Sequence, residues 1–404
     1  MGRNNISEIV KLKRRLYIEL LRLVKEGQLV EEISNLSKKM ITKDTPRYRC
    51  CEFKERAIFD ERIKAVMGFN IAENKDKSLE ELAASLPLEN KNKDIVEVIE
   101  TACDSCPIDK YIVTDACRNC VAHKCVSCGS CIAACPFGAI TESSDLISVA
   151  VELSSDKNKL AAMLAPSFVG QFGYQQSAAK INYALKKLGF EKVNEVAGGA
   201  EITAAEESKE LEEKIEADQT LLSSCCPAFK SMVVNEFAEL KDLISNTDSP
   251  MAVTAKNIKG KDSNLKTVFV GPCTAKKEEA LADENVDFVL TFAELLSLFT
   301  ASNINLAQIK DKEKLEDAGL LGRQFAYAGG LEKSMQELAA SDFESRQIDG
   351  LGRLKKELHL IKAGKNNYDF LEGMACTGGC VGGPFSMINQ KLAKKMVKEF
   401  AESN

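Results

Sequence analysis

Cysteine is the residue type in this sequence with the greatest capacity for chemistry. The 404 residues include 15 cysteines and only two histidines, so a metal centre would be held by thiolates and not by imidazoles. An intracellular chain keeps its thiols reduced, and we therefore interpret the cysteines as metal ligands or reactive groups, not as disulfides. They fall into five groups: Cys50–Cys51, eight residues between 103 and 135, Cys225–Cys226, Cys273, and Cys376 with Cys380.

The stretch "CVSCGSCIAACPFGAI" (125–140) has the spacing C-x2-C-x2-C-x3-C-P. Its two-residue gaps allow Cys125, Cys128 and Cys131 to bind three corners of one iron–sulfur cube. The thiolate before the proline, here Cys135, conventionally reaches a second cluster. The spacing predicts ferredoxin-type 4Fe–4S clusters. A zinc ribbon is the alternative, because "CDSC" (103–106) and "CRNC" (117–120) are two separated C-x2-C pairs.

The eight cysteines of this stretch are enough for two four-iron clusters. The four that precede residue 125 would supply one ligand to the first cluster and three to the second, which Cys135 completes. The alternative is a single cluster with several idle thiols. Cys50 and Cys51 receive no role: we expect them to be core or incidental thiols, with cluster ligands as the alternative. The eight predicted ligands are Cys103, Cys106, Cys117, Cys120, Cys125, Cys128, Cys131 and Cys135.

The adjacent pair in "LLSSCCPAFK" (221–230) raises a separate question. A disulfide between neighbouring residues is strained, because adjacent positions do not offer the usual separation of the two Cα atoms. The two thiols are therefore predicted to have different roles. Cys225 and Cys226 end one predicted strand and Cys273 ends another, and ligands of open α/β sheets bind beyond the carboxyl ends of the strands.

Strands and helices alternate in the sequence after residue 150. This order predicts an α/β fold with mainly parallel sheets flanked by helices. Residues 6–40 are predicted to be helical, and the charged stretch 73–94 an exposed linker around a short helix. Strands are predicted over 159–167, 192–199, 219–226 and 265–273, and helices over 177–190, 201–216 and from Pro227 onward.

Composition excludes several classes of protein. The chain has 54 Lys and Arg residues and 60 Asp and Glu residues, which gives a net charge of −6. It therefore lacks the excess of positive charge that would indicate nucleic-acid binding. We expect no membrane span and no secretory signal, and hence a cytoplasmic protein. The expected domains are a helical N-terminal region and linker (1–98), a ferredoxin-like segment (99–150) and a catalytic domain (151–404).

Three segments together resemble the signatures of the iron-only, or [FeFe], hydrogenases. They are "SSCCPAF" (223–229), "GPCTAKKEE" (271–279) and "LEGMACTGGCVGGP" (371–384), in that order behind the ferredoxin-like stretch. The N-terminal segments "RCCEFKERAIFDERI" (49–63) and "ACDSCPIDKYIVTDACRNCVAHKC" (102–125) are similar to the monomeric clostridial-type branch. The resemblance implies a two-lobed catalytic domain, the reaction 2H⁺ + 2e⁻ ⇌ H₂ and electron delivery through the N-terminal clusters. It also implies a small ferredoxin as electron partner and maturation proteins that insert the cofactor.

The resemblance implies a cofactor called the H-cluster. Cys226, Cys273, Cys376 and Cys380 would bind a 4Fe–4S cube, and Cys380 would bridge it to a di-iron unit with carbonyl, cyanide and amine-dithiolate ligands. Lys276 would donate to one cyanide, a compact cation meeting an anion in a dry pocket. The other implied contacts to this unit are Pro166, Ser167 and Met374.

The resemblance also assigns Cys225, which would stay unligated and pass protons to the bridging amine. A thiol suits this task because its pKa lies nearer neutrality than that of a hydroxyl. The relay to solvent would continue through Glu207, Ser245 and Glu210, although most of the seven glutamates between 201 and 216 would simply be hydrated.

The sequence departs from the family pattern at two positions near the predicted site. Gly271 stands where better-known members have methionine, and is expected to open space beside the di-iron unit. Phe229 replaces the usual tryptophan. Two other functions are alternative hypotheses: an iron–sulfur assembly factor that lacks the di-iron unit, and a hydrogen sensor with slow turnover.

Overall fold

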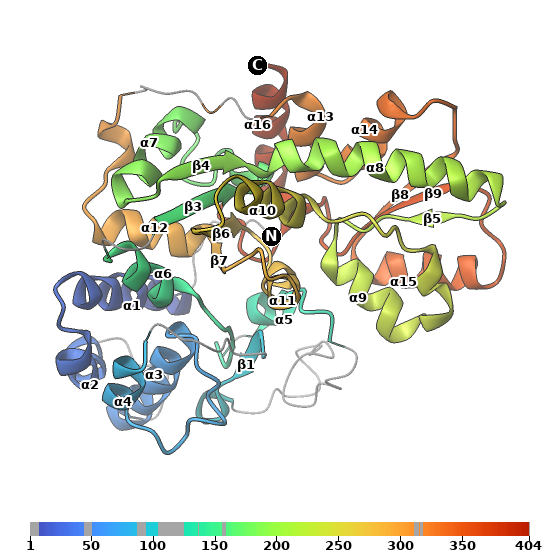
Figure 1. The fold of residues 1–404 in the computed structure, drawn as a ribbon. Helices are drawn as coiled ribbons and strands as arrows, with labels where there is room; N and C mark the ends of the chain where they lie inside the picture. Colours follow the sequence, from blue (N-terminus) through green and yellow to red (C-terminus); the bar gives the residue numbers. More distant parts are fainter. Residues whose placement is uncertain are drawn as a thin grey trace. The chain divides into compact units, whose positions relative to one another are not determined.

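The computed structural model describes residues 8–43, 51–86, 94–103, 125–135, 137–155, 159–310, 315 and 318–403. The chain divides into two compact units. The first comprises 1–122, 129–159 and 293–305, and the second comprises 123–128, 160–292 and 306–404. Figure 1 shows the helices and strands of each unit.

The first unit begins with helices. The helix predicted over 6–40 is two helices, α1 (Glu8–Lys25) and α2 (Leu29–Met40), because the chain turns at Gly27 with a φ of 69°. Such a left-handed conformation is readily adopted only by glycine. The charged stretch after residue 73 contains a short helix as predicted, α4 (Leu79–Ala84), which starts with a capping box between Ser78 and Glu81.

A small antiparallel ribbon forms the rest of the core of this unit. Strand β1 (Val96–Val98) pairs with β2 (Ile140–Glu142), and Ile99 and Ala139 beside them are almost completely buried. The Lys13 ammonium lies 2.5 Å from the Glu142 carboxylate, and this ion pair links α1 to β2. The other helices of the unit are α3 (Glu52–Val66), η1 (Glu100–Ala102), α5 (Ser130–Ala134), α6 (Leu146–Leu153) and α12 (Phe292–Ala301).

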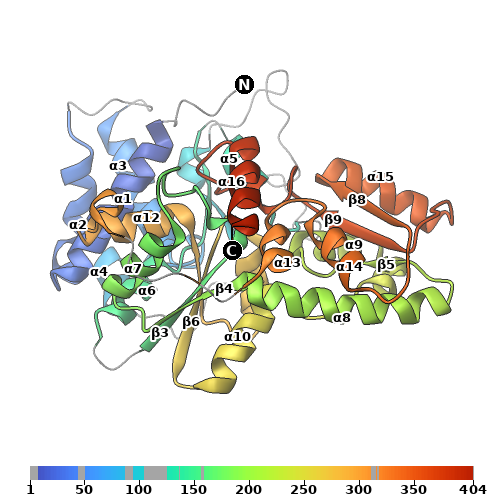
Figure 2. The same ribbon diagram turned by 90° about the horizontal axis from the view of Figure 1, so that it is seen from above.

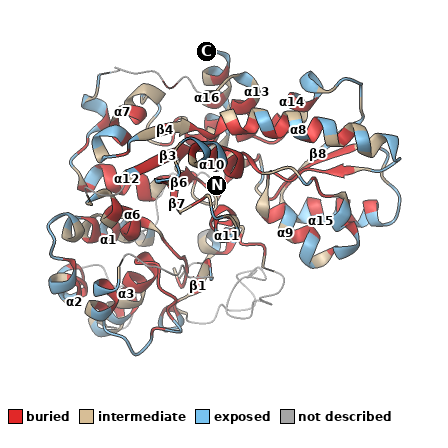
Figure 3. Ribbon diagram, in the orientation of Figure 1, coloured by how far each residue is buried: buried red, intermediate tan, exposed pale blue. Residues whose placement is uncertain are grey.

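The second unit contains two sheets, and the first of them has the order β4-β3-β6-β7. Strand β3 (Lys159–Leu164) is parallel to β4 (Lys192–Glu195), and β6 (Leu265–Gly271) is parallel to β7 (Phe288–Thr291). The apolar runs of β3 and β6 are buried, as expected for parallel strands covered on both faces. Figure 3 shows this burial as red along the strands.

The second sheet has the order β5-β9-β8, with all pairings parallel. It is formed by β5 (Leu221–Leu222), β8 (Ser345–Asp349) and β9 (Phe370–Met374). Helices α9 (Pro227–Glu236) and α15 (Leu351–Lys362) cover one face, while α14 (Gly330–Leu338) and α8 (Val196–Glu216) cover the other. The strand predicted over 219–226 therefore exists but is only two residues long. The predicted α/β class is confirmed.

Helix α8 runs from the end of β4 along the second sheet (Figure 2) and begins earlier than predicted. The residues expected to extend β4 to Gly199 are instead the first turn of α8. The reason is close packing on α10 (Pro250–Lys261): a Cβ on Gly199 would lie 2.5 Å from the carbonyl oxygen of Pro250. Small residues at 197, 199 and 200 thus serve a helix–helix contact, which strand periodicity does not reveal.

The remaining elements of the second unit are short or peripheral. They are η3 (Pro166–Phe168), α7 (Ala178–Leu188), η4 (Ala238–Leu243), α11 (Ala275–Ala282), η5 (Leu306–Gln308), α13 (Leu320–Arg323), η6 (Gln324–Ala326), η7 (Cys380–Gly382) and α16 (Gln390–Glu402). Helix α7 ends at Gly189 as predicted, with a φ of 113°. Within the described ranges, no helix combines the length and the apolar character needed to cross a lipid bilayer.

Candidate functional site

A cavity of about 80 Å³ lies in the second unit, where four strands end. A buried water needs only about 10–15 Å³ of such volume, so this space can accept a polyatomic group. Strands β3, β5, β6 and β9 each lead into a lining segment at their carboxyl ends, as predicted. The predicted site residues on the wall are Pro166, Ser167, Cys225, Cys226, Cys273, Lys276, Met374, Cys376 and Cys380.

Four of the thiols surround this cavity in a low-dielectric environment. Burial raises the pKa of Cys273 and Cys380 to about 12, and the neighbouring sulfur of Cys226 contributes to both increases. Such thiols lose their protons when a metal binds them. Among the described residues, no three Cys, His, Asp or Glu side chains converge closely enough to share one metal ion. The spread of the four sulfurs around a cavity favours a multi-iron cluster over a single zinc ion.

Local structure explains the position of Cys226. This residue is the N-cap of α9, with Pro227 at the first helical position, where its missing N–H costs nothing. The backbone N–H of Ala375 points at the Cys226 sulfur, 3.5 Å away. Helix N-termini and N–H groups stabilise a thiolate, so this position suits a metal ligand.

The loop that carries Cys376 and Cys380 is held by its own backbone. The N–H of Gly378 donates to Asp349 Oδ2 at 2.6 Å, and the carbonyl of Gly378 accepts from the N–H of Ala328 at 3.1 Å. Gly379 has a φ of 83°, and a Cβ there would lie 2.4 Å from the Ala328 nitrogen. Glycine is therefore required between the two cysteines.

Asp349→Ala is expected to lower the iron retained in the second unit by about tenfold, because the loop bearing two of the thiols loses its anchor. The measurement is iron per chain after reconstitution and desalting. Arg353→Gln is the matched control: Arg353 pairs with Asp349 on the surface, and such pairs contribute little. Equal iron content in Asp349→Ala and wild type would contradict the anchoring role.

Two buried polar groups face an otherwise apolar cavity. The Ser167 side chain is fully buried, and its hydroxyl has no hydrogen-bond partner among the described residues. The Lys276 ammonium donates to Ser249 Oγ at 2.9 Å and to Glu279 Oε2 at 2.6 Å. One of its three N–H groups is then left to donate to a group in the cavity. An unsatisfied hydroxyl and a buried cation fit a cofactor with anionic ligands.

Behind Cys225 lies a buried carboxyl group. Glu207 is fully buried on α8, and its Oε1 accepts from the Ser224 N–H at 2.8 Å and from the Ser224 hydroxyl at 2.7 Å. Burial raises the pKa of Glu207 to about 7. Burial, together with the nearby Glu207 charge, also raises the pKa of the Cys225 thiol well above its usual value.

The next two predicted residues lead away from Glu207. The Ser245 hydroxyl donates to Glu210 Oε2 at 2.7 Å, and it also acts on the Glu207 carboxyl, where it partly offsets the rise in pKa. Glu210 is half-buried, so its carboxylate contacts water. The structure thus places Ser245 against Glu210 and close to Glu207, and Glu207 close to Cys225.

The predicted cluster ligands near residue 125 are described only in part. Cys106, Cys117 and Cys120 lie outside the described residues. Cys128 packs against the apolar cluster around Phe229, which also contacts Cys226 and Cys273. Cys103 and Cys135 pack against a different apolar cluster, in the first unit. The N–H of Ala139 donates to the Cys135 sulfur at 3.4 Å.

The expectation that Gly271 opens space in the site is wrong. The ring of Phe269 fills that space: a Cβ on Gly271 would lie 2.6 Å from Phe269 Cε1. Phe229 has a similar partner, since a Cβ on Gly373 would lie 2.4 Å from its ring. The sequence analysis missed Phe269 as a wall residue, along with Met251, Phe325 and the Ser224 donor to Glu207. Phe269 and Ser224 lie beside a cysteine motif in the sequence, whereas no sequence pattern marks Met251 or Phe325.

Five thiols and one buried cation line a single cavity in a parallel α/β unit, and these residues fit an iron–sulfur centre. Comparison with family models agrees: residues 158–384 match the model described as iron only hydrogenase large subunit, C-terminal domain. The chain belongs to this family. Residues 121–141 match a 4Fe-4S binding domain.

Individual relatives are distant. Iron hydrogenase 1 of Clostridium pasteurianum is 29% identical over 321 residues, which cover 65% of this chain and 56% of that protein. A probable cytosolic Fe-S cluster assembly factor of Drosophila erecta is 25% identical over 275 residues, covering 53% of this chain and 57% of that protein. In both cases the match spans less than two thirds of the relative's own length.

One solved structure supports the fold. It concerns the oxygen inactivation of an [FeFe]-hydrogenase through its H cluster 2Fe subcluster, and it superposes with a TM-score of 0.51 at 21% identity. The superposition covers 65% of this chain and 89% of that one. At this identity the likeness concerns the fold.

Proposed function

We propose that this protein is an [FeFe]-hydrogenase that catalyses the reversible reduction of protons to H₂ at an H-cluster. One observation carries the proposal. The cavity combines four candidate ligand thiols with a fifth thiol, Cys225, which lies in front of a buried carboxyl group. An iron–sulfur cluster alone needs four thiolates, and a protonated thiol backed by an acid is the arrangement of a proton relay.

The residues around the cavity have separate tasks in this proposal. Cys226, Cys273, Cys376 and Cys380 would hold the 4Fe–4S cube, and Cys380 would also serve the di-iron unit. Lys276 and Ser167 donate to anionic ligands of that unit, Pro166 offers its backbone, and Met374 packs against it. When bound, the di-iron unit supplies an open metal position beside an electron reservoir.

The chain itself moves the protons. A proton enters at the half-buried Glu210, passes the Ser245 hydroxyl to Glu207, and leaves the Cys225 thiol toward the cofactor. Glu207 suits its position because a carboxyl group with a pKa of about 7 exchanges protons readily in either direction near neutral pH. The apolar wall, including Phe269 and Phe325, excludes bulk water from the cavity.

Electrons would arrive through accessory clusters held by the stretch 103–135. Cys128 packs on the same apolar cluster as two cube ligands, which supports a short path between an accessory cluster and the cube. Cys103 and Cys135 pack against one apolar cluster of the first unit, which supports a second accessory cluster. A small ferredoxin as electron partner, maturation proteins, a cytoplasmic location, the clostridial-type branch and the domain boundaries 1–98, 99–150 and 151–404 belong to this proposal.

Reconstituted protein without the di-iron unit is expected to contain roughly twelve irons per chain, because three cubes carry four irons each. Chemical iron quantitation measures this number, and electron paramagnetic resonance counts the accessory signals. Roughly eight irons with one accessory signal would show that the eight cysteines hold a single accessory cluster.

Infrared spectroscopy tests the proposed function directly. Matured protein is expected to show carbonyl and cyanide bands and to evolve H₂ from a chemical reductant. The relative among the cluster assembly factors favours a second candidate, an assembly protein that keeps the cube and lacks the di-iron unit. Protein that binds the full complement of iron without these bands would establish that candidate. Bands with very slow turnover would indicate a hydrogen sensor.

A further inference from the structure

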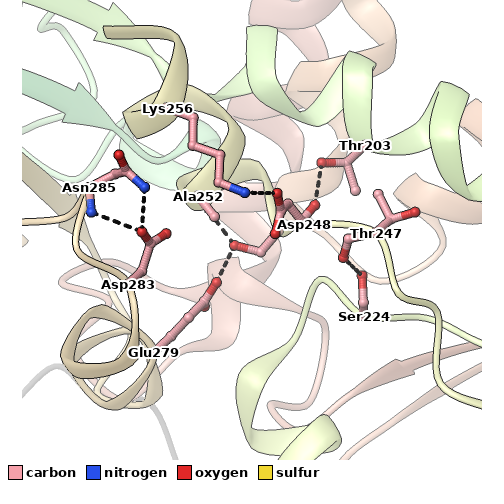
Figure 4. Close-up of polar contacts among 10 residues, drawn as sticks. Thr203, Ser224, Thr247, Asp248, Ala252, Lys256, Glu279, Asp283 and Asn285 are labelled. Carbon is pink, nitrogen blue, oxygen red and sulfur yellow. Dashed lines mark hydrogen bonds and ion pairs between the residues drawn. The ribbon is translucent and has the colours of Figure 1, made fainter. Parts of the chain in front are cut away.

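Lys276 is held by two residues that the sequence did not single out. Its ammonium donates to Ser249 Oγ at 2.9 Å and to Glu279 Oε2 at 2.6 Å, and the Ser249 hydroxyl donates to the other oxygen of Glu279. Ammonium, hydroxyl and carboxylate therefore form a closed triangle. Figure 4 shows Glu279 reaching toward the start of α10, where Ala252 and Asp248 lie.

The triangle is built by two helices. Glu279 follows Lys276 by three residues on α11, so both side chains lie on one face of that helix. Ser249 is the N-cap of α10, and its hydroxyl oxygen also accepts the Ala252 N–H at 3.4 Å. Contacts to α10 and α11 together fix the position of the ammonium nitrogen. A lysine on one helix alone would keep the rotamer freedom of its long side chain.

The triangle separates two spaces of different character. Lys276 lines the thiol cavity, whereas Ser249 and Glu279 line a polar hollow of about 780 Å³ on the other side. The Glu279 side chain is 20% exposed and the Lys276 side chain 11%. The carboxylate thus keeps part of its hydration at the hollow, while the ammonium is largely removed from water.

The unequal exposure of the two side chains indicates the role of Glu279. A buried ammonium is costly unless a partner charge and hydrogen bonds compensate it. Glu279 supplies that charge from the wall of the hollow, where its side chain is more exposed than that of Lys276. Two of the three N–H groups of Lys276 are used in the triangle, and the third is free to serve an acceptor in the cavity.

We propose that Glu279, together with Ser249, is a positioning residue that aims the ammonium of Lys276 at the anionic ligands of the di-iron unit. Glu279 touches no part of the thiol cavity and acts through Lys276. The inference rests on the proposed hydrogenase function. It means that two residues outside the thiol cavity, on the wall of the polar hollow, also determine how the cofactor is bound.

The first experiment needs no di-iron unit. The full chain carrying its iron–sulfur clusters is treated briefly with acetic anhydride, and mass spectrometry follows acetylation of each lysine. Glu279→Ala is expected to raise the acetylation rate of Lys276 by about tenfold, because loss of the ion pair lowers the pKa of the amine, and each pKa unit makes the reactive neutral form about ten times more abundant. Glu278→Gln is the matched control, since Glu278 is exposed, lies on the same helix and lines the same hollow. An unchanged rate in Glu279→Ala would overturn the proposal.

The second experiment reads the cofactor by infrared spectroscopy after loading with a synthetic di-iron complex. Glu279→Ala is expected to shift a cyanide band and to weaken uptake of the complex by about tenfold, with no shift in Glu278→Gln. In a Lys276→Gln background, Glu279→Ala should add nothing further, because residues that act through one another are not additive. An equal additional shift in that background would contradict a role through Lys276. Failure of the wild type to take up the complex would instead refute the hydrogenase function. The acetylation experiment would still test whether Glu279 holds Lys276 in place.

Discussion

Cys225→Ala is expected to reduce H₂ turnover by roughly 10²–10⁴-fold, the usual contribution of a positioned proton donor. Alanine removes the thiol that lies between Glu207 and the cavity and leaves the four proposed ligands in place. Iron content and the carbonyl and cyanide bands should therefore match those of the wild type. Gas chromatography of H₂, normalised to bound iron, measures the effect.

The neighbouring residue supplies the control for this prediction. Cys226→Ala removes a proposed cube ligand, and we expect it to lose the cube and all turnover together. The two adjacent thiols would then differ in kind: one variant keeps its iron and the other does not. Near-normal turnover in Cys225→Ala, or loss of its cube, would show that Cys225 has another role.

Glu207→Gln is expected to slow turnover by about 10²-fold or more, because an amide accepts the same hydrogen bonds as a carboxylate but cannot carry a proton. The amide oxygen can still accept from the Ser224 N–H and hydroxyl. Rates should be measured from pH 6 to pH 9 at constant iron content. Unchanged rates across this range would remove Glu207 from the relay.

Stability measurements separate this effect from misfolding. Burial raises the pKa of Glu207 from 4.5 to about 7, so the folded state favours the protonated carboxyl. The stability that this protonated group contributes is complete below pH 4.5 and is lost as the pH rises through 7. Glutamine has no such loss. Glu207→Gln should therefore melt at or above the wild-type temperature at pH 8, whereas Glu206→Gln, on the exposed side of α8, should change neither melting nor turnover.

The sequence by itself determined the proposed ligand set and the cavity at which four of its thiols meet. Thiolate spacing is local chemistry: "CVSCGSC", the adjacent pair at 225–226 and the C-x3-C at 376–380 are readable in short windows. Parallel strands align their carboxyl ends whatever residues connect them. The strand–helix alternation was therefore sufficient to predict that Cys226 and Cys273, 47 positions apart, would line one cavity.

Only the tertiary structure decided how the surroundings of that ligand set are built. Residues 201–216 contain seven glutamates with the same local pattern, and packing of α8 on the second sheet buries Glu207 completely. Gly271 indicated an open space, yet the ring of Phe269, two positions earlier on the same strand, fills it. Glu279 pairs directly with Lys276, and Ser249, the N-cap of a different helix, bonds to both. Burial, cavity shape and pKa depend on which distant surfaces meet, and no spacing along the chain encodes that contact.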